Sequence, residues 1–513
     1  MRTLFQPFVE KRFLRLFFLG VFCGALGVFA FAPFAFWPAI AVSIAGFSWL
    51  QTQSISHKHA AWLGFSVGLG HFGAGTSWIY VSIANYGQVG LIISVLITFA
   101  FITVLSAFYA LAGFLCSHFF TRVSMLSKPF IISLTLLFTE YLRSHLFTGF
   151  PWLLAGYSME KSPLFELSPI GGIWLLTFVC LLSFSLPIFL FKNKQLQWKK
   201  ELICLFCVIG LWGSSSFLSQ QNTQWVSEKD TIQTTLVQGN LKQEEKWLTE
   251  QAVKSLEYYQ QATVENLDSD LVIWPETAIT YLHHQVSNHL KPFQKTLLET
   301  NTTLITGIPY YNQENNRYHN SVWAMGEGFG LYFKQRLVPF GEYIPFADYV
   351  GKLLDLFGMP MSTFSAGEKN QPVLQVREWG AAAFICYEIV YPELVRSLVR
   401  DSDFLITISN DGWFGDSIGP IQHLQIAQFR AKESGRYVVR STNTGISAII
   451  DHHGKITAQA PQFVRTTLTA PVKTTVGITP YVKYGNLIVL SLILIMVMLY
   501  TAAFFMNSRM KPD

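Results

Sequence analysis

Eight long apolar runs constrain this chain more than any other feature of its sequence. A helix that crosses a membrane needs about 20 mainly apolar residues, and seven of the runs lie before residue 220. Only 13% of the residues are charged, against about 25% in a soluble domain. The sequence therefore predicts a polytopic α-helical membrane protein, whose expected spans are residues 13–32, 36–51, 60–81, 89–118, 129–146, 167–191, 202–219 and 485–506.

The distribution of Lys and Arg predicts the orientation of the spans, because cytoplasmic loops of membrane proteins carry an excess of both. With the N-terminus in the cytoplasm, the short loops on the far side hold only two basic residues, Arg143 and Lys161. The cytoplasmic side then holds thirteen, which are Arg2, Lys11, Arg12, Arg15, Lys58, Arg122, Lys128, Lys192, Lys194, Lys199, Lys200, Arg509 and Lys511. We favour an uncleaved anchor over a signal peptide for the first span, because six more spans follow it directly.

The spans divide the chain into three expected domains. Residues 1–219 are expected to form a seven-helix transmembrane domain, and residues 220–484 a soluble-like domain outside the cytoplasm. Residues 485–513 are expected to form a C-terminal transmembrane helix and a short cytoplasmic tail, so that both termini are cytoplasmic. The net charge of +5 comes largely from the basic flanks of the spans, and it gives no reason to expect nucleic acid as a partner.

Residues 231–457 alternate short β-branched runs with amphipathic stretches. Alternation of this kind is typical of an α/β domain with a central sheet or sheets. The expected strands are residues 231–238, 271–274, 303–308, 321–325, 381–385, 404–409, 437–441 and 446–450, and the expected helices are residues 246–266, 286–300, 391–400 and 420–434. A domain of about 265 residues is long enough to bury its own core.

One cysteine stands apart from the other five. Cys386 lies in the domain outside the cytoplasm, whereas the others lie in expected spans, at Cys23, Cys116, Cys180, Cys204 and Cys207. Exported domains use cysteines mainly as disulfide pairs. A lone cysteine is therefore either buried and inert or a reactive thiol, and the cysteine pattern by itself leaves both possibilities open.

Cys386 and two other ionisable residues follow the ends of expected strands. Glu276 comes after the run LVIWP, Lys334 after LYF and Cys386 after AAAFI. In open α/β sheets, sites form at the carboxyl ends of strands. If the three side chains meet there, Glu276 can accept the thiol proton and Lys334 can stabilise the thiolate and later an oxyanion. Both residues also have a purely structural interpretation. Glu276 can be an acidic residue at a helix N-terminus, and Lys334 can be a strand residue on the surface.

Four motifs of this domain resemble those of the nitrilase (carbon–nitrogen hydrolase) superfamily. They are VIWPETAIT, KQRLVPFGEYIPF, FICYEIVYPE and TISNDGWFGDSIGPIQHLQIAQFRAKESGRYVVRSTNTG, all within residues 231–460. Together with the seven spans before the domain and one after it, they are similar to the bacterial apolipoprotein N-acyltransferase family. The resemblance implies a polytopic α-helical membrane domain plus an α/β nitrilase-like domain, a four-layer αββα sandwich.

The resemblance also implies roles for particular residues. Cys386 is the expected nucleophile, Glu276 the general base and acid, and Lys334 the residue that stabilises the tetrahedral intermediate. Supporting or substrate-binding roles are expected for Trp247, Glu342, Tyr387, Glu388 and Trp413. The two supporting glutamates have an alternative interpretation as ion-pair partners, and the two tryptophans as core residues. The family chemistry requires no metal and no other cofactor.

By the same resemblance, the enzyme transfers a fatty acyl group from a membrane phospholipid, with phosphatidylethanolamine as the expected donor. The acyl group passes through a thioester on Cys386 to the free α-amine of the diacylglyceryl-cysteine of an apolipoprotein. The expected location is the bacterial inner membrane, with residues 220–484 on the periplasmic side. Residues 344–364 are unusually apolar, and we expect a membrane-dipping lid there rather than a buried helix.

Three other functions fit parts of the sequence. A membrane-tethered amidase or nitrilase would share the triad but pass the acyl group to water. A transporter or channel would carry ionisable residues inside its spans, where Glu140, Arg143 and His71 are the few candidates. In an inert lipoprotein-binding scaffold, Cys386 would be expendable.

Overall fold

The computed structural model describes residues 2–87, 90–190, 198–220, 225–339, 341–343, 364–491, 493, 494, 497, 498 and 501. The chain forms two compact units. The first comprises Met1–Tyr80, Ile92–Thr223 and Tyr484–Asp513, and the second comprises Val81–Leu91 and Gln224–Lys483. The lid expected at residues 344–364 lies outside the described residues, except for Phe364.

The first unit is helical. Its α-helices are α1 (Arg2–Gly27), α2 (Ile40–Thr52), α3 (His57–Gly75), α5 (Gly90–Phe120), α6 (Lys128–His145), α7 (Ser168–Leu190) and α8 (Trp198–Gln220). Short 3-10 helices join them, at η1 (Val28–Ala30), η2 (Trp37–Ala39), η3 (Met125–Ser127), η4 (Ala155–Met159) and η5 (Pro163–Leu167). Each of the seven spans expected before residue 220 thus overlaps an α-helix.

Three helical segments of the described chain, Lys11–Ala30, Gly90–Phe120 and Pro163–Leu190, are long and apolar enough to cross a membrane. Helix α5 also exposes a row of large apolar side chains, namely Leu91, Ile92, Val95, Leu96, Phe99 and Val104. An exposed apolar surface of this extent is typical of contact with lipid or with another protein. The first unit is therefore the membrane-associated part of the molecule.

The helices differ from the expected spans in two places. Helix α2 has only 13 residues, fewer than the roughly 20 that a span requires, because η2 replaces its first turn. The span expected at residues 60–81 ends at Gly75, and the chain then forms the short helix α4 (Ile79–Tyr86). Most of α4 belongs to the second unit. The span expected at residues 485–506 is described only in part.

Small residues let the helices of the first unit approach closely. A Cβ atom at Gly24 of α1 would meet the carbonyl oxygen of Val67 in α3. A Cβ atom at Gly64 of α3 would likewise meet the carbonyl oxygen of Tyr109 in α5. Glycine at these positions allows backbone-to-backbone packing, which is the usual way that helices associate in membranes.

The second unit is an α/β domain. Its strands are β1 (Val226–Gln238), β2 (Leu271–Ile273), β3 (Thr303–Asn312), β4 (Arg317–Gly326), β5 (Gly328–Phe333), β6 (Leu374–Val376), β7 (Trp379–Ile385), β8 (Phe404–Ser409), β9 (Val438–Thr442), β10 (Ala448–Ile450), β11 (Ile456–Gln459) and β12 (Thr466–Gly477). Its helices, besides α4, are α9 (Thr249–Val264), α10 (His283–Val286), α11 (Lys291–Glu299), α13 (Pro392–Val399), α14 (Gly419–Ser434) and α15 (Pro480–Tyr484), with η6 (Cys386–Val390) and η7 (Asp411–Phe414).

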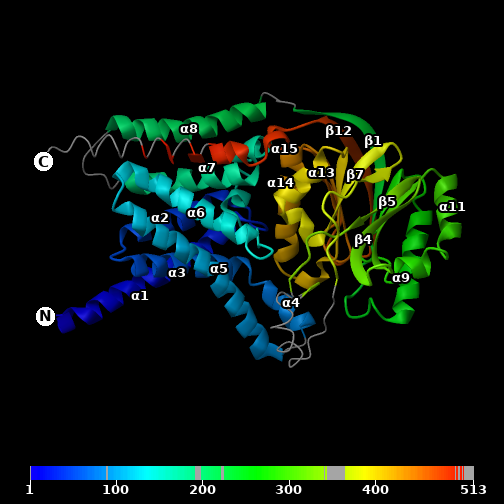
Figure 1. Cartoon of the computed structure of the whole chain (residues 1–513), viewed down its shortest axis with the longest axis horizontal. Coiled ribbons are helices and arrows are strands. Elements are labelled where there is room, and N and C mark those ends of the chain that lie inside the picture. The colour runs from blue at the N-terminus through cyan, green and yellow to red at the C-terminus, as the bar shows by residue number, and fades with distance from the viewer. Residues whose placement is uncertain are drawn as a thin grey trace. The chain divides into compact units, whose positions relative to one another are not determined.

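The twelve strands form one continuous sheet in the order β11-β10-β9-β8-β7-β6-β5-β4-β3-β2-β1-β12. The sheet folds back on itself, because β1 packs against β9 and β4 packs against β7. Helices α9 and α11 cover the half that contains β1, β3 and β4, while α13 and α14 cover the half that contains β7 and β9 (Figure 1). This arrangement confirms the predicted four-layer αββα sandwich.

Each half of the sheet contains a set of parallel strands. In one half β1, β2 and β3 run parallel, and in the other β7, β8 and β9 do. Glu276 follows β2, Cys386 follows β7 and Asn410 follows β8. The carboxyl ends of parallel strands are the usual location of sites in such sheets, and the three residues all lie at such ends.

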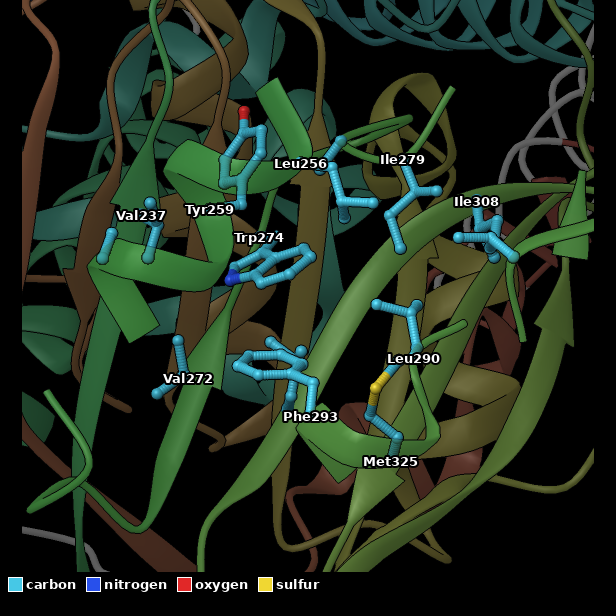
Figure 2. Close-up of a cluster of buried hydrophobic side chains, with 14 of the residues drawn as sticks. Val237, Leu256, Tyr259, Val272, Trp274, Ile279, Leu290, Phe293, Ile308 and Met325 are labelled. Carbon is cyan, nitrogen blue, oxygen red and sulfur yellow. The ribbon is translucent and has the colours of Figure 1, made fainter. Parts of the chain in front are cut away.

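A buried aromatic cluster fixes the end of β2. Figure 2 shows the Trp274 indole between Tyr259 and Phe293, with ring centroids 5.2 and 6.1 Å away. The backbone amide of Trp274 donates to Ile305 O, and its indole N–H donates to Thr263 Oγ1, each at 2.9 Å. Trp274 is fully buried, so this cluster holds the backbone two residues before Glu276.

Candidate active site

Glu276 lies in a tight turn that the fold must hold in place. The next residue, Thr277, has a φ of 51°, which is strained for a β-branched residue. Gly307 of β3 lies directly against this turn, and a Cβ atom there would clash with the backbone of Glu276 and Thr277. The side chain of Lys246 donates from Nζ to the carbonyl oxygen of Glu276 at 3.0 Å. The carboxylate is therefore presented by a turn with constrained geometry.

Lys334 follows β5 and lies between two carboxylates. Its Nζ is 2.8 Å from Glu342 Oε1 and 3.7 Å from Glu276 Oε1. Asn320 of β4 donates from Nδ2 to both glutamates, at 2.8 Å to Glu276 Oε1 and 3.1 Å to Glu342 Oε1. The amide N–H of Asn410 donates to the other oxygen of Glu276 at 2.8 Å. The site thus contains a buried cation with two carboxylates whose orientation is fixed.

Cys386 lies in the left-handed region of backbone space, with a φ of 53°. It follows β7 directly and is buried. The charges of Glu276 and Lys334 both act on its thiol. The structure therefore brings together the three ionisable residues that follow strands in the sequence.

Glu388 connects the strand ends that carry Lys334 and Cys386. Its carboxylate is fully buried and accepts hydrogen bonds from the amides of Ile385 (2.8 Å) and Gln335 (2.6 Å). The amide of Arg336 (3.0 Å) and the hydroxyl of Tyr332 (3.0 and 3.1 Å to its two oxygens) also donate to it. These donors belong to the ends of β5 and β7, so Glu388 fixes the spacing of Cys386 and Lys334.

We expect Glu388→Gln to lower both stability and activity. The amide would present an N–H₂ group to at least one of these N–H or O–H donors, and an unsatisfied buried donor costs about 1–3 kcal/mol. Thermal melting and the rate of acyl-enzyme formation on the same preparation check this expectation. Glu378→Gln, at an exposed glutamate in the turn before β7, is the control. Wild-type melting and rate in Glu388→Gln would contradict the role assigned to Glu388.

The thiol of Cys386 is protonated in the resting site. Burial raises its pKa to about 12, the negative charge of Glu276 adds to this effect, and the positive charge of Lys334 only partly opposes it. The stabilisation of the thiolate that the sequence suggested for Lys334 is therefore outweighed by burial and by the charge of Glu276. For Lys334, burial acts to lower the pKa, but the charges of Glu342 and Glu276 hold it above its ordinary value. A reaction in which this thiol acts as a nucleophile would therefore need a base to accept its proton.

Alkylation by iodoacetamide tests this charge arrangement, because the thiolate is the reactive form. In the wild-type protein we expect the rate at Cys386 to rise about tenfold per pH unit from pH 7 to 10 without a plateau. Removing a neighbouring negative charge favours the thiolate. Glu276→Gln should therefore lower the pKa of Cys386 and accelerate alkylation at a given pH, although it should slow acyl transfer. A wild-type plateau near pH 8 would show a preformed thiolate instead.

Sequence reasoning missed three polar residues that contact Glu276. They are Lys246, Asn320 and Asn410. Burial lowers the pKa of Lys246 to about 8, while the charge of Glu276 acts in the opposite direction. The strand-end pattern that pointed to Glu276, Lys334 and Cys386 also applies to Asn410, because Asn410 directly follows β8. Nothing in the sequence around Asn320, in the middle of β4, distinguishes it from an ordinary strand residue.

Trp247 lies beside this site at the edge of a groove. It is 54% exposed, and it directly follows Lys246. A groove of about 320 Å³ is lined by Trp247, Thr280, Leu282, Gln285, Pro309, Tyr318 and Phe364. The amide of Phe364 donates to the carbonyl oxygen of Glu342 at 3.0 Å. A largely apolar groove therefore reaches the residues that surround the Lys334 ion pair.

Trp413 lies on η7, three residues after Asn410, and is 40% exposed. Helix α4 holds this turn. Tyr86 donates from its hydroxyl to the carbonyl oxygen of Gly412 at 2.8 Å, and its ring packs edge-on against that of Trp413 at 4.8 Å. Ser82 donates to the carbonyl oxygen of Trp413 at 2.7 Å. The half-buried Tyr387 packs its ring 5.5 Å from that of Tyr391.

Two family models match this chain. The model described as "Carbon-nitrogen hydrolase" matches residues 233–481. The model described as "Apolipoprotein N-acyltransferase N-terminal domain" matches residues 23–186. The two matches overlap the second and the first unit, respectively.

Curated relatives match most of the chain. A protein of Pseudomonas aeruginosa is 40% identical over 471 residues, which are 91% of both chains. A protein of Azotobacter vinelandii is 40% identical over 473 residues, and one of Vibrio parahaemolyticus is 38% identical over 479 residues. Both of these matches cover 91% of this chain. They cover 91% of the Azotobacter protein and 92% of the Vibrio protein. All three are named apolipoprotein N-acyltransferase.

Among solved structures, a nitrilase-superfamily protein of Saccharomyces cerevisiae is similar to part of this chain. The match covers 49% of this chain and 92% of the yeast protein, at 20% identity and a TM-score of 0.36.

Proposed function

The chain belongs to the apolipoprotein N-acyltransferase family, and on that premise we propose that Cys386, Glu276 and Lys334 are its catalytic residues. As a member of this family it is a bacterial membrane enzyme of lipoprotein maturation, and it transfers a fatty acyl group through a cysteine acyl-enzyme. The acyl group comes from a membrane phospholipid, and the acceptor is the α-amine of an apolipoprotein's diacylglyceryl-cysteine. Phosphatidylethanolamine is the donor that we propose.

In the first half of the proposed reaction, the thiol of Cys386 attacks an ester carbonyl of the phospholipid. Glu276 accepts the thiol proton as the S–C bond forms, since the thiol is neutral in the resting site. The developing oxyanion lies near Lys334, whose charge stabilises it. When the C–O bond breaks, Glu276 returns the proton to the departing lysophospholipid oxygen, and a thioester remains on Cys386.

In the second half, the free amine of the lipoprotein attacks the thioester carbonyl. Glu276 accepts the amine proton and delivers it to the sulfur of Cys386 as the S–C bond breaks. The product is an amide, which is more stable than a thioester, so this half runs downhill. The thiol is regenerated, and the acceptor becomes a triacylated lipoprotein.

The main support for the proposal is the position of the Lys334 ammonium beside the carboxylates of Glu276 and Glu342. Lys334 is fully buried, and its Nζ contacts both Glu276 and Glu342. A buried charge is retained only where partners balance it. Lys334 therefore places a positive charge beside the carboxylate that we propose as the base. The groove beside Trp247 offers an apolar surface to a fatty chain, and Trp247, Glu342, Tyr387, Glu388 and Trp413 are proposed to support this chemistry.

We also propose that residues 220–484 face the periplasm and that both termini are cytoplasmic. The excess of Lys and Arg in the loops assigned to the cytoplasm supports this orientation. A green fluorescent protein fused to the C-terminus should fluoresce, and alkaline phosphatase at the same position should be inactive. An active phosphatase fusion would reverse the assignment.

The function is tested with the detergent-purified full chain, phosphatidylethanolamine and a synthetic diacylglyceryl-cysteine peptide. Mass spectrometry of the peptide should show the gain of one fatty acyl group. The same peptide with its α-amine acetylated is the matched control, and it should not change. Release of free fatty acid without acylation of the peptide would identify a hydrolase instead. Phosphatidylglycerol in place of the donor tests the headgroup assignment.

A further inference from the structure

The backbone carbonyl of Cys386 is held by a residue that plays no part in the reaction described above. The ring nitrogen Nε2 of His423 lies 3.2 Å from the carbonyl oxygen of Cys386. His423 is fully buried and belongs to α14, 37 residues further along the chain. Cys386 has a φ of 53°, and a non-glycine residue persists in such a conformation only where surrounding structure fixes it.

The neighbours of His423 determine which of its ring nitrogens carries the proton. A carbonyl oxygen can only accept a hydrogen bond, so Nε2 must carry the hydrogen that points to Cys386. The other nitrogen, Nδ1, lies 3.1 Å from Arg440 Nη2 and 3.3 Å from Asp411 Oδ1. Because a guanidinium can only donate, Nδ1 accepts from Arg440 and carries no proton. Burial and the charge of Arg440 lower the pKa of His423, which agrees with a neutral ring.

Asp411 completes the arrangement without needing a hydrogen bond from His423. Its oxygen Oδ2 accepts from Arg440 Nη2 at 2.5 Å, and Oδ1 accepts from the hydroxyl of Ser409 at 2.6 Å. Burial alone would raise the pKa of Asp411, but the charge of Arg440 holds it below its usual range. An ionised Asp411 therefore fixes Arg440, Arg440 fixes the tautomer of His423, and His423 donates to Cys386.

We propose that His423 is a positioning residue for the nucleophile, and that its Nε2–H holds the left-handed turn in which β7 ends at Cys386. The amide of Ile385, one residue before Cys386, donates to Glu388 at 2.8 Å. Two buried side chains from different elements thus hold the backbone on either side of the Cys386 α-carbon. The inference deepens the proposed function, since it rests on Cys386 being the nucleophile.

Two amide substitutions at His423 separate this role from a general need for a polar side chain. In His423→Gln the amide nitrogen can take the place of Nε2 and still donate to Cys386. In His423→Asn the amide nitrogen matches Nδ1 and does not reach that carbonyl. Both variants are neutral, and both remove the ring.

The full-length variants in detergent are given phosphatidylethanolamine, and acyl-enzyme formation is followed by intact-mass spectrometry at several donor concentrations. We expect His423→Gln to stay within about threefold of the wild-type maximal rate and His423→Asn to lose about 100-fold, as for a reacting atom displaced by roughly 1 Å. The donor concentration at half-maximal rate should not change, because His423 does not contact the donor. Equal rates in the two variants would overturn the proposal.

A second variant covers the case in which His423→Asn does not fold. His423→Met fills similar space without a donor, and it should show the same loss of rate relative to His423→Gln. If its rate equals that of His423→Gln, the proposal fails. Failure of the proposed function gives a different result, since the wild-type protein would then form no adduct at Cys386.

Discussion

Replacing Cys386 with alanine is expected to abolish acyl transfer while the protein stays folded. The thiol supplies the only atom proposed to bond to the acyl group, and removal of a covalent nucleophile typically costs on the order of 10⁴-fold or more. Cys386 is buried at the end of β7, and alanine fits the same space. The rate of peptide acylation and the consumption of phospholipid should fall together.

Cys180→Ser is the matched control for this variant. Cys180 is a buried free cysteine in α7 of the first unit, and it has no proposed part in the reaction. We expect its replacement to leave the acyl-transfer rate unchanged. Substantial peptide acylation by Cys386→Ala, at an unchanged melting temperature, would show that another residue carries the acyl group.

Replacing Lys334 with methionine is expected to damage both catalysis and stability. Methionine has a similar length but no charge, so it leaves the buried Glu276 and the partly buried Glu342 without the cation that they share. Removing one partner of a buried ion pair costs about 3–5 kcal/mol, and losing a group that stabilises an oxyanion costs about 10²–10³-fold in rate. Acyl-enzyme formation and thermal melting measure the two effects separately.

Lys295→Met is the control for the lysine substitution. Lys295 lies on α11 with an exposed side chain, 3.6 Å from Glu299, and exposed pairs of this kind contribute little. We expect wild-type melting and wild-type activity from this variant. A Lys334→Met protein that forms the acyl-enzyme at the wild-type rate would remove Lys334 from the catalytic set.

Much of this architecture follows from the sequence because strong local patterns encode it. Apolar runs of about 20 residues mark membrane helices, and each expected run before residue 220 overlaps a helix. The eight expected strands all lie on strands of the second unit, because β-branched residues in short runs favour buried strands. The ends of the expected strands then predicted that Glu276, Lys334 and Cys386 meet at the carboxyl ends of the strands.

Pairing between distant segments is not encoded in this local way. Strand β12 pairs with β1 along most of its length, yet it lies more than 220 residues away in sequence, and its run of threonines was not expected to form a strand. Only the first three residues of helix α4 lay in an expected membrane span, and nothing in the sequence predicted that the helix contacts the turn that carries Trp413. Such contacts depend on the tertiary fold.

The protonation state of the Cys386 thiol could not be predicted from the sequence either. A cysteine next to a lysine suggests a thiolate, because a nearby cation lowers the pKa of a thiol. In the fold, burial and the charge of Glu276 outweigh Lys334 and keep the thiol protonated. The balance depends on how deeply the group is buried and on distances of a few ångströms, which spacing along the chain does not reveal.

The central claim is that Cys386 carries the acyl group between the two substrates. The most direct test is intact-mass and peptide-mapping mass spectrometry of the full chain after incubation with phosphatidylethanolamine. Our account predicts one fatty-acyl adduct, located on Cys386, which persists in water and disappears when a diacylglyceryl-cysteine peptide is added. An adduct on another residue, or one that water discharges as fast as the peptide does, would contradict it.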